Sequence, residues 1–587
     1  MSKLLISTML LLGLFTATAM ANDTIRVVGA KMTPGNNMQA KSNDGGILEF
    51  VLQDRDFQPF CQSAVLQSTA QAKQGPKAEK PFFHVRCALP IPPVYTKTDV
   101  AALTGIDIGV YRHNHSPGFE VADNGDALAI YFSTPAGKAE KDTSTTFVQA
   151  RLRYGCEDWD MPELFFATER QNDQSGLLWN DNGTLWFFGG GRDISDYVPF
   201  RIAKSTDNGA TWTYTIPILN SPAKDYTAQP ICNAFRGKDG AIYMAMDADG
   251  SQSFLWRSTD EGKTWTDMGG RTGGRHSTIV PLDDKGTLLS IGGKNANVDG
   301  WTPKNISTDW GKTWSQSESI HFPQLSSGQR PSMIRLQSGS LVFVSDGYLH
   351  KRNIAPPASW KKSHDAFIAI SKDNGKTWRV KTLPVGLPQD GRPQYTSLGY
   401  STVRQAPNGT IHILATKDYP GIHYELNEAW IWSDAGAVKP EQTGGKIRNY
   451  SENYSDGKLK SKWSARICPN GRYLLHGEQV DYYPSGRIQH QVSYVNGRKS
   501  GVEIFWDELG RKVWQWNRDL KTNRGTWTHY WQNGNKKIVS EWDIYPKMRD
   551  RAYRFFGYVA DGDACHYDKQ GKLTNTYHFD RGVIQEK

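Results

Sequence analysis

The sequence predicts an all-β protein built from repeated hairpins, and two internal repeats carry this prediction. An eight-residue turn pattern recurs four times between residues 205 and 378, and a second pattern with a 24-residue period occupies the last quarter of the chain. Between the turns, short apolar runs alternate with polar residues and stop at Gly, Asn or Asp, which is typical of strands. With 587 residues, the chain is long enough for two or three domains.

Residues 1–21 have the parts of a secretory signal peptide. Lys3 is followed by an apolar run over residues 4–15 and by an Ala-Met-Ala motif that ends at Ala21, which is the order of such a leader. The apolar run is shorter than the ~20 residues that cross a bilayer, and no longer run follows. We therefore expect no transmembrane segment, cleavage near Ala21, and a secreted protein that is extracellular or periplasmic.

The charge and cysteine content exclude several classes of protein. The 69 Lys and Arg are nearly balanced by 60 Asp and Glu, so the net charge of +9 is not that of a nucleic-acid-binding tail. A modest positive balance suits an anionic ligand. The six cysteines are far apart and form no CxxC metal cluster. Cys61 and Cys87, which flank the basic segment 71–80, could form a disulfide after export.

The first repeat has the pattern Ser-x-Asp-x-Gly-x-Thr-Trp. In such a turn the Asp side chain caps backbone N–H groups, Gly supplies a positive φ and Trp packs beneath the turn. A degraded fifth copy covers residues 432–436. Spacings of 53, 49 and 64 residues fit one four-stranded propeller blade each. The four full copies begin at Ser205, Ser258, Ser307 and Ser371.

A hairpin precedes each of the four full turns, another lies upstream of them, and a sixth precedes the degraded copy. In each, an apolar strand leads into a turn with Gly, and a second strand follows. Six units of this kind predict a six- or seven-bladed β-propeller over residues 106–445. The segment 22–105 reads as additional β structure that could close the ring. The turn glycines are Gly125, Gly183, Gly240, Gly286, Gly339 and Gly409.

Residues 446–587 contain the second repeat. Gly486, Gly510 and Gly534 are 24 residues apart, and aromatic pairs such as Tyr482-Tyr483 keep nearly the same register. Each unit resembles the MORN-type hairpin, so we expect a one-dimensional stack of hairpins. An accessory or packing role is favoured over a sugar- or envelope-binding one.

One polar residue per blade stands at an equivalent position, nine to eleven residues before the turn glycine. Because the first strand of a propeller blade lines the central channel, these side chains should converge on one concave site. Arg275 adjoins the fourth position. The six positions are His115, Gln174, Gln229, His276, Arg330 and Tyr400.

The Ser-x-Asp-x-Gly-x-Thr-Trp turns resemble the Asp boxes of the sialidase-like, BNR-repeat superfamily of six- and seven-bladed propellers. The resemblance implies the fold more than the reaction, because one propeller hosts many functions. It also implies that the Asp boxes are peripheral and structural. Hydrolases of that superfamily use three arginines with Tyr, Glu and Asp. Here the Phe-Arg-Ile-Ala segment at 200–203 matches their motif imperfectly, and the predicted column contains no carboxylate; Glu120 and Asp173 are nearby.

Glycoside hydrolysis usually needs two carboxylates, whereas β-elimination from a uronic acid needs a neutralised substrate carboxylate, a base and an acid. The column offers Arg330, with Gln174 and Gln229, to hold that carboxylate. It also resembles the sites of β-propeller lyases that act on ulvan. The segment His113-Asn-His115-Ser-Pro117 is similar to a His-containing motif in the first blade of those enzymes.

The sequence therefore predicts a secreted polysaccharide lyase that acts on an acidic, ulvan-like polysaccharide. In this hypothesis His115 or His276 is the base, Tyr400 is the acid, and Arg275 binds a sulfate or a second uronate. A sialidase-like glycoside hydrolase and a non-catalytic glycan-binding propeller are the alternatives. No cofactor is required; a divalent cation such as calcium could bind Asp247-Ala-Asp249-Gly250, which otherwise reads as a turn.

Overall fold

The computed structural model confirms that the chain is all-β. The residues it describes form forty-three strands, two 3-10 turns, η2 (Gln71–Lys73) and η3 (Ala101–Thr104), and one short helix, α2 (Glu428–Trp432). No helix among them is long and apolar enough to cross a membrane. The signal-peptide residues and Cys61 lie outside the described ranges, which are 24–54, 64–88, 101–106, 113–135, 138–192, 194–325, 329–346, 366–383, 387–388, 396–418, 422–436, 444–544 and 558–585.

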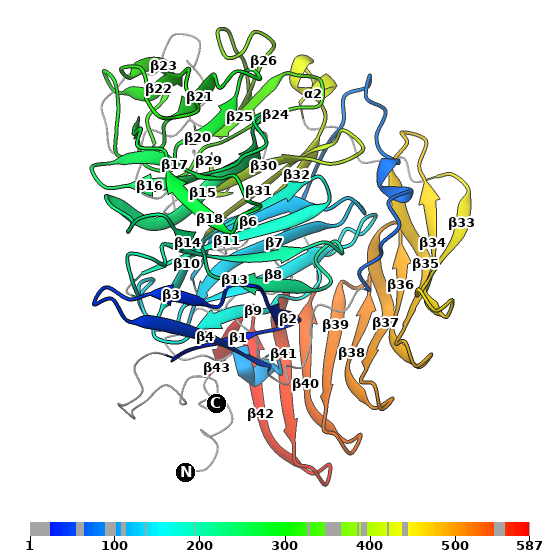
Figure 1. The fold of residues 1–587 in the computed structure, drawn as a ribbon. Helices are drawn as coiled ribbons and strands as arrows, with labels where there is room; N and C mark the ends of the chain where they lie inside the picture. Colours follow the sequence, from blue (N-terminus) through cyan, green and yellow to red (C-terminus); the bar gives the residue numbers. More distant parts are fainter. Residues whose placement is uncertain are drawn as a thin grey trace.

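In this part of the chain, antiparallel blades, most of them built on four strands, follow one another along the sequence (Figure 1). The first strand of each blade contacts the first strand of the next, and β30 of the last blade contacts β6 of the first. The first three blades are β6 (His113–Val121), β7 (Ala127–Thr134), β8 (Thr146–Leu152) and β9 (Glu163–Thr168); β10 (Asn172–Asp181), β11 (Thr184–Arg192), β12 (Phe200–Ser205) and β13 (Trp212–Thr215); and β15 (Tyr226–Arg236), β16 (Ile242–Ala248), β17 (Gln252–Ser258) and β18 (Thr264–Asp267).

The remaining three blades contain β20 (Thr278–Pro281), β21 (Leu288–Ile291), β22 (Trp301–Ser307) and β23 (Glu318–Pro323); β24 (Ser332–Arg335), β25 (Leu341–Ser345), β26 (Phe367–Ser371) and β27 (Arg379–Thr382); and β30 (Tyr400–Gln405), β31 (Ile411–Asp418) and β32 (Ile422–Leu426). Short pairings add β14 (Ile218–Leu219) to β18 and β19 (Thr272–Gly273) to β17, and join β28 (Leu387–Pro388) to β29 (Thr396–Ser397).

The N-terminal segment supplies strands to three blades. β5 (Phe83–Cys87) pairs antiparallel with β32, so the last blade obtains its fourth strand from a part of the chain that precedes the first. β1 (Thr24–Gly29) lies between β9 and β4 (Ile47–Asp54), to which β3 (Gln39–Lys41) is added. β2 (Met32–Pro34) pairs with β13 in the second blade. This segment therefore closes the ring and widens its first two blades.

The four Asp boxes lie between the third and fourth strands of their blades, where they hold the turn together. In the first, Asp207 Oδ1 accepts hydrogen bonds from Ser205 Oγ at 2.7 Å and from the Thr211 backbone N–H at 2.9 Å. The same two bonds recur in the other three boxes. Gly209 has φ +80°, which only glycine adopts without strain. All these Asp atoms serve the turn, in agreement with a structural role.

Residues 447–585 form one antiparallel sheet, β33 to β43, that lies along one side of the propeller (Figure 1). Its inner face shares a continuous apolar core with the first blade: Trp463, Trp514 and Trp527 are buried in the same cluster as Phe119 and Tyr131. The strands are β33 (Ile447–Asn453), β34 (Leu459–Ile467), β35 (Tyr473–Tyr482), β36 (Ile488–Val495), β37 (Arg498–Trp506), β38 (Lys512–Asp519), β39 (Arg524–Tyr530), β40 (Lys536–Asp543), β41 (Val559–Tyr567), β42 (Leu573–Asp580) and β43 (Val583–Gln585).

A buried charged network reinforces this junction. The ring of His490 is fully buried, with Nδ1 3.1 Å from Asp481 and Nε2 2.9 Å from Glu503. Because both nitrogens face carboxylates, both donate and the ring is an imidazolium. Burial lowers the pKa of His490, but the hydrogen bonds to Asp481 and Glu503 outweigh it and raise the pKa above its usual value. Lys499 joins Glu503 to Asp160 of the propeller, at 2.9 and 2.8 Å.

The shared core leads to a prediction about truncation. The separate repeats suggest that a chain ending near residue 445 would fold alone, but the structure buries Phe119 and Tyr131 of the first blade against the repeat sheet. We expect deletion of residues 446–587 to give insoluble protein, because a large apolar face becomes exposed. Co-expression of residues 446–587 as a separate chain should restore soluble protein, measured by gel filtration. A monodisperse, soluble truncated chain would contradict the shared core.

His490 predicts a pH dependence of stability. Since its folded pKa is raised above the unfolded value of about 6.5, the stabilisation is fully present below pH ~6.5 and is lost as pH rises through the folded pKa. Urea unfolding from pH 6 to 9 should show a declining free energy of unfolding in the native protein. His490→Gln should remove this component of the slope, whereas His578→Gln, at an exposed position, should retain it. Equal slopes in the native and His490→Gln proteins would rule out a buried imidazolium.

Candidate functional site

The ring brings the innermost strands together, and polar side chains from three blades meet there. Arg275 and His276 precede β20, Gln229 lies in β15, Tyr400 begins β30, and Lys294 follows β21. Arg275 and Lys294 pair within one blade, whereas Gln229 and Tyr400 reach them because the blades are arranged around one axis.

Asp247 at the end of β16 anchors two of the predicted residues. Its fully buried carboxylate accepts hydrogen bonds from Arg275 Nε at 3.0 Å and from the His276 backbone N–H at 2.6 Å, and it lies 2.9 Å from His276 Nδ1. Burial raises the pKa of Asp247, but His276 and Arg275 outweigh it and hold the pKa below its usual value. A terminal guanidinium nitrogen of Arg275 donates to Gln229 Oε1 at 2.7 Å. Asp247 thus lies near the end of β16, ahead of the turn at 249–250, and orients Arg275 and His276.

His276 is held in a defined orientation and is neutral at physiological pH. Burial lowers its pKa to about 3, more than Asp247 can offset. Its backbone has φ +59°, a left-handed conformation that costs energy in a non-glycine residue and often marks a functional site. Its ring lies edge-on to the ring of Tyr400, with centroids 5.6 Å apart. With a pKa this low, His276 is a weak base, so its predicted role as the base loses support.

Lys294 contacts the hydroxyl group of Tyr400. Its ammonium donates to Tyr400 Oη at 2.8 Å, and both side chains are almost completely buried. Burial lowers the pKa of Lys294 to about 8, although Asp247 acts in the opposite direction. Burial raises the pKa of Tyr400, and Glu140 adds to this effect. Gly293 allows its own backbone to lie close to that of Arg275, because a Cβ at this position would collide with the carbonyl of Arg275.

Glu140 supplies a carboxylate that the sequence analysis missed. Gln174 Nε2 donates a hydrogen bond to Glu140 Oε1, and the charge of Glu140 influences the pKa of both Tyr400 and Lys294. The six predicted positions contain no carboxylate, but Glu140 and Asp247 lie beside them and contact Gln174 and Arg275. The lack of a carboxylate in the column therefore does not exclude hydrolysis.

Other predicted residues have different surroundings. Arg330 is buried and donates to Ser401 O at 3.2 Å and to Pro117 O at 3.0 Å, so these bonds brace β30 and β6. Its guanidinium also lies 5.8 Å from the Tyr400 ring. The side chain of His115 lies outside the described side chains, although its backbone pairs with β7 and β31.

The two acids considered from the sequence are engaged elsewhere. Glu120 forms a buried ion pair with Arg404 at 2.9 Å. Asp173 is paired with Arg201 of the Phe-Arg-Ile-Ala segment. Neither faces a second carboxylate in these contacts, so neither supplies the pair of acids that hydrolysis would require.

A sequence signal for Asp247 and Lys294 existed. In an antiparallel hairpin the end of the second strand lies beside the start of the first. Counting seven or eight residues forward from Gly240 and Gly286 gives Asp247 and Lys294, just as counting backward gives the predicted column. Glu140 lies in the connection after β7, where no periodicity marks it.

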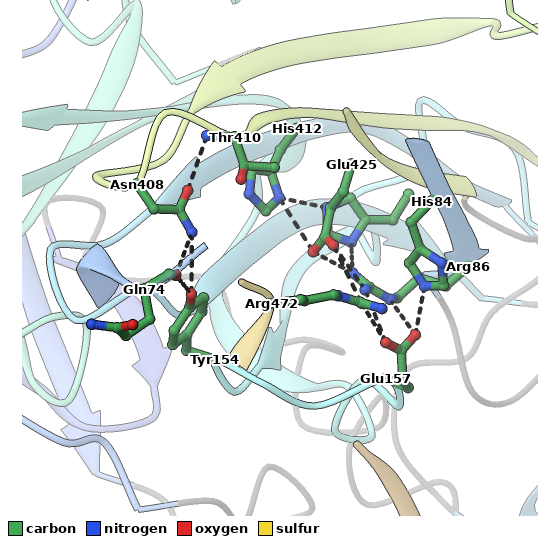
Figure 2. Close-up of polar contacts among 11 residues, drawn as sticks. Gln74, His84, Arg86, Tyr154, Glu157, Asn408, Thr410, His412, Glu425 and Arg472 are labelled. Carbon is green, nitrogen blue, oxygen red and sulfur yellow. Dashed lines mark hydrogen bonds and ion pairs between the residues drawn. The ribbon is translucent and has the colours of Figure 1, made fainter. Parts of the chain in front are cut away.

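A second polar cluster joins the propeller to the repeat sheet (Figure 2). Arg86 of β5 contacts Glu425 of β32 at 2.6 Å and Glu157 at 3.2 Å, and Arg472 of the repeat sheet contacts both carboxylates. His84 lies 2.6 Å from Glu157. Burial raises the pKa of each glutamate, but the two arginines outweigh it and hold both pKa values well below the usual range. These alternating charges hold the propeller and the repeat sheet together, which is a structural role.

The same cluster includes the one set of three potential metal ligands found among the described residues: His412, His423 and Glu425. His412 Nδ1 and His423 Nε2 are 2.9 Å apart and share a hydrogen bond, while Arg86 approaches His423 Nδ1 at 3.2 Å. Since an arginine must donate, His423 accepts at Nδ1 and is neutral. Arg86 already compensates the charge of Glu425, so these residues do not fit a cation.

Comparisons with known proteins agree with a repeated β fold. Residues 125–413 match the family described as BNR repeat-like domain, and residues 475–496 match the MORN repeat variant. A protein named sialidase from Bacteroides fragilis is 25% identical over 289 residues, which is 47% of this chain and 52% of that protein. The chain therefore spans about half the length of this curated relative.

Solved structures resemble the chain at lower identity. A protein of unknown function from Dyadobacter fermentans has a TM-score of 0.41 and 18% identity, covering 55% of this chain and 98% of that chain. A Trypanosoma rangeli sialidase in complex with sialic acid has a TM-score of 0.37 and 14% identity, covering 81% and 89%.

Proposed function

From the premise that the chain contains a BNR-repeat, sialidase-like domain, we propose that it is a secreted, glycan-processing enzyme that acts on an acidic sugar at the centre of the propeller. The observation that carries this proposal is the Lys294–Tyr400 contact of 2.8 Å beside Arg275 and His276. A buried phenol that contacts an ammonium is suited to act as a nucleophile or a proton donor, and not only to pack.

Arg275 and Lys294 are the groups proposed to bind the substrate's carboxylate. The side chain of Arg275 is 22% exposed and is oriented by Asp247 and Gln229. Charge-assisted hydrogen bonds from such cations are roughly twice as strong as neutral ones. Arg330, whose hydrogen bonds brace the backbone, is a positioning residue in this proposal.

Hydrolysis is the first candidate reaction. Tyr400 Oη would attack the anomeric carbon while its proton passes to Glu140, and the bond to the leaving sugar would break as its oxygen takes a proton from water. Water would then attack the anomeric carbon and release the sugar, and Glu140 would return its proton to Tyr400 Oη. Because the charge of Glu140 raises the pKa of the phenol, the phenolate would form only as Glu140 accepts the proton, with the cations stabilising it.

β-Elimination from a uronic acid is the second candidate, and the Lys294–Tyr400 pair favours it. Lys294, with a pKa of about 8, is close to the range in which an amine can accept a proton. Neutral Lys294 would remove the C5 proton, Tyr400 would protonate the departing 4-linked oxygen, and a C4–C5 double bond would form. The predicted ulvan-type substrate belongs to this alternative.

Tyr400→Phe tests the proposed centre. Removal of the hydroxyl should lower kcat by about 10²–10⁴-fold, the range of a positioned acid or base, with little change in unfolding temperature. The assay uses sialyllactose, oligogalacturonate and ulvan, and measures both reducing ends and ultraviolet absorbance of unsaturated uronate. Reducing ends alone indicate hydrolysis, and both signals indicate elimination.

The matched control is Tyr243→Phe, which removes a hydroxyl that donates to Asp239 at 2.8 Å in a blade turn. It should retain full activity. If Tyr400→Phe also retains full activity on a turned-over glycan, Tyr400 is not the reacting group. If no acidic glycan is turned over, the non-catalytic propeller becomes the better explanation.

Lys294 predicts a pH dependence of substrate binding. Because its pKa is lowered to about 8, its positive charge is lost as pH rises through that value, and KM for an anionic substrate should increase between pH 7 and 9. In Lys294→Arg the charge persists, so this increase should disappear. In Lys294→Met, KM should be high at all pH values. A rise in KM that Lys294→Arg leaves unchanged would assign the titration to another group.

A further inference from the structure

The repeat sheet carries the whole net charge of the protein. Residues 446–587 contain 25 Lys and Arg against 16 Asp and Glu, whereas residues 1–445 contain 44 of each. Asp481 and Glu503 are among the acids of the repeat sheet, and both are buried on the inner face. Three cations, Arg472, Lys499 and Arg518, are buried as well, so the rest of the repeat domain keeps nearly all of the positive excess, which suits a polyanion.

A row of aromatic side chains follows the hairpin ends on the outer face of the sheet. Each ring stands at a β-bulge directly after a residue such as Asp481 or Phe505, both of which are buried. Tyr530 Oη donates to Gln515 Oε1 at 3.4 Å, and Gln515 alternates with the inward-facing Trp514 and Trp516, so the ring of Tyr530 lies on the outer face. All four are partly exposed. Their cross-strand partners are exposed aliphatic residues or lysines, as in the pairs Tyr482–Ile488, Trp506–Lys512, Tyr530–Lys536 and Tyr567–Leu573.

Successive rings are separated by one repeat. Each repeat advances the sheet by two strands, or about 9.6 Å, and the row runs across the strands from β35 to β41. Cations lie beside the row. Lys512 Nζ lies 5.9 Å from the centre of the Tyr530 ring, and Lys537 Nζ lies 4.8 Å from that of Trp531, which follows Tyr530 and donates to the carbonyl of Tyr567.

We propose that this row binds an extended anionic polysaccharide, with sugar rings stacked on Trp506 and Tyr530 and with acidic groups paired to Lys512 and Lys537. Aromatic faces provide apolar area for the C–H face of a sugar, and the lysines provide charge-assisted hydrogen bonds to carboxylate or sulfate. A linear polymer fits the row because the spacing repeats in one direction only.

A polysaccharide explains the row better than a membrane does. The aromatic rings are partly buried in the sheet, whereas membrane-inserting residues extend into the acyl boundary. The sheet is fixed to the propeller by the shared core, so a chain bound to the repeats would be held at a constant position relative to the propeller. This binding surface is independent of the reaction at Tyr400.

The test is affinity electrophoresis of the full chain in native gels that contain polygalacturonate, dextran sulfate or neutral dextran. We expect retardation by the two polyanions and much less by dextran. The double variant Trp506→Ala/Tyr530→Ala should raise the apparent Kd about tenfold or more, since about 1.4 kcal/mol of stacking corresponds to a factor of ten. Trp506→Phe/Tyr530→Phe keeps both rings and should bind like the native protein.

Lys512→Gln/Lys537→Gln should weaken binding to the polyanions, whereas Lys238→Gln/Lys263→Gln, at exposed sites on the propeller, should not. Unfolding temperatures confirm that the variants are folded. Native-like binding by the folded Ala variant overturns the proposal, as does stronger binding to single-stranded DNA or phosphatidylserine vesicles than to both polyanions. Turnover of a short soluble glycan should be unchanged in all these variants, so a failure here is distinguishable from a failure of the Tyr400 site.

Discussion

The pairing of β5 with β32 is the contact on which the arrangement of the molecule depends. It attaches a segment that precedes the first blade to the last blade, and β30 then contacts β6. Closure brings Tyr400, from the last blade, beside His276 and Lys294, which flank strands of the fourth. The candidate site thus depends on closure, because Tyr400 is 106 residues from Lys294 in sequence and reaches it only through the ring.

The two buried polar clusters differ in how completely their charges are balanced. At the junction, Arg86 and Arg472 compensate Glu157 and Glu425 completely, and the carboxyl pKa values fall well below normal. Such a network fixes the relative position of two sheets, and removing one partner would leave a buried, unpaired charge. At the centre of the propeller, Arg275, Lys294 and Arg330 outnumber the two acids, Asp247 and Glu140. An excess of cations near a phenol is the arrangement that an anionic substrate would complete.

The two faces of the repeat sheet have different roles. The inner face supplies tryptophans to a core that it shares with the first blade, and buries the His490 network. The outer face presents an aromatic row with lysines. One 24-residue pattern produces both, since alternate residues of each strand point to opposite faces.

The sequence by itself determined the all-β class, the turn of each Asp box, and the hairpins of both domains, because period-two alternation and turn glycines are local properties. It also identified Gln229, Arg275, His276 and Tyr400, since equal offsets from turn glycines place residues at equal depth in a propeller. Tertiary structure alone decided which carboxylates accompany them. Glu140 comes from a connection without periodicity, and Asp247 meets its partners, 28 and 29 residues away, only in the folded chain. It also decided that the repeats share a core with the propeller, because the burial of one sheet face against another depends on side chains that are far apart in the chain.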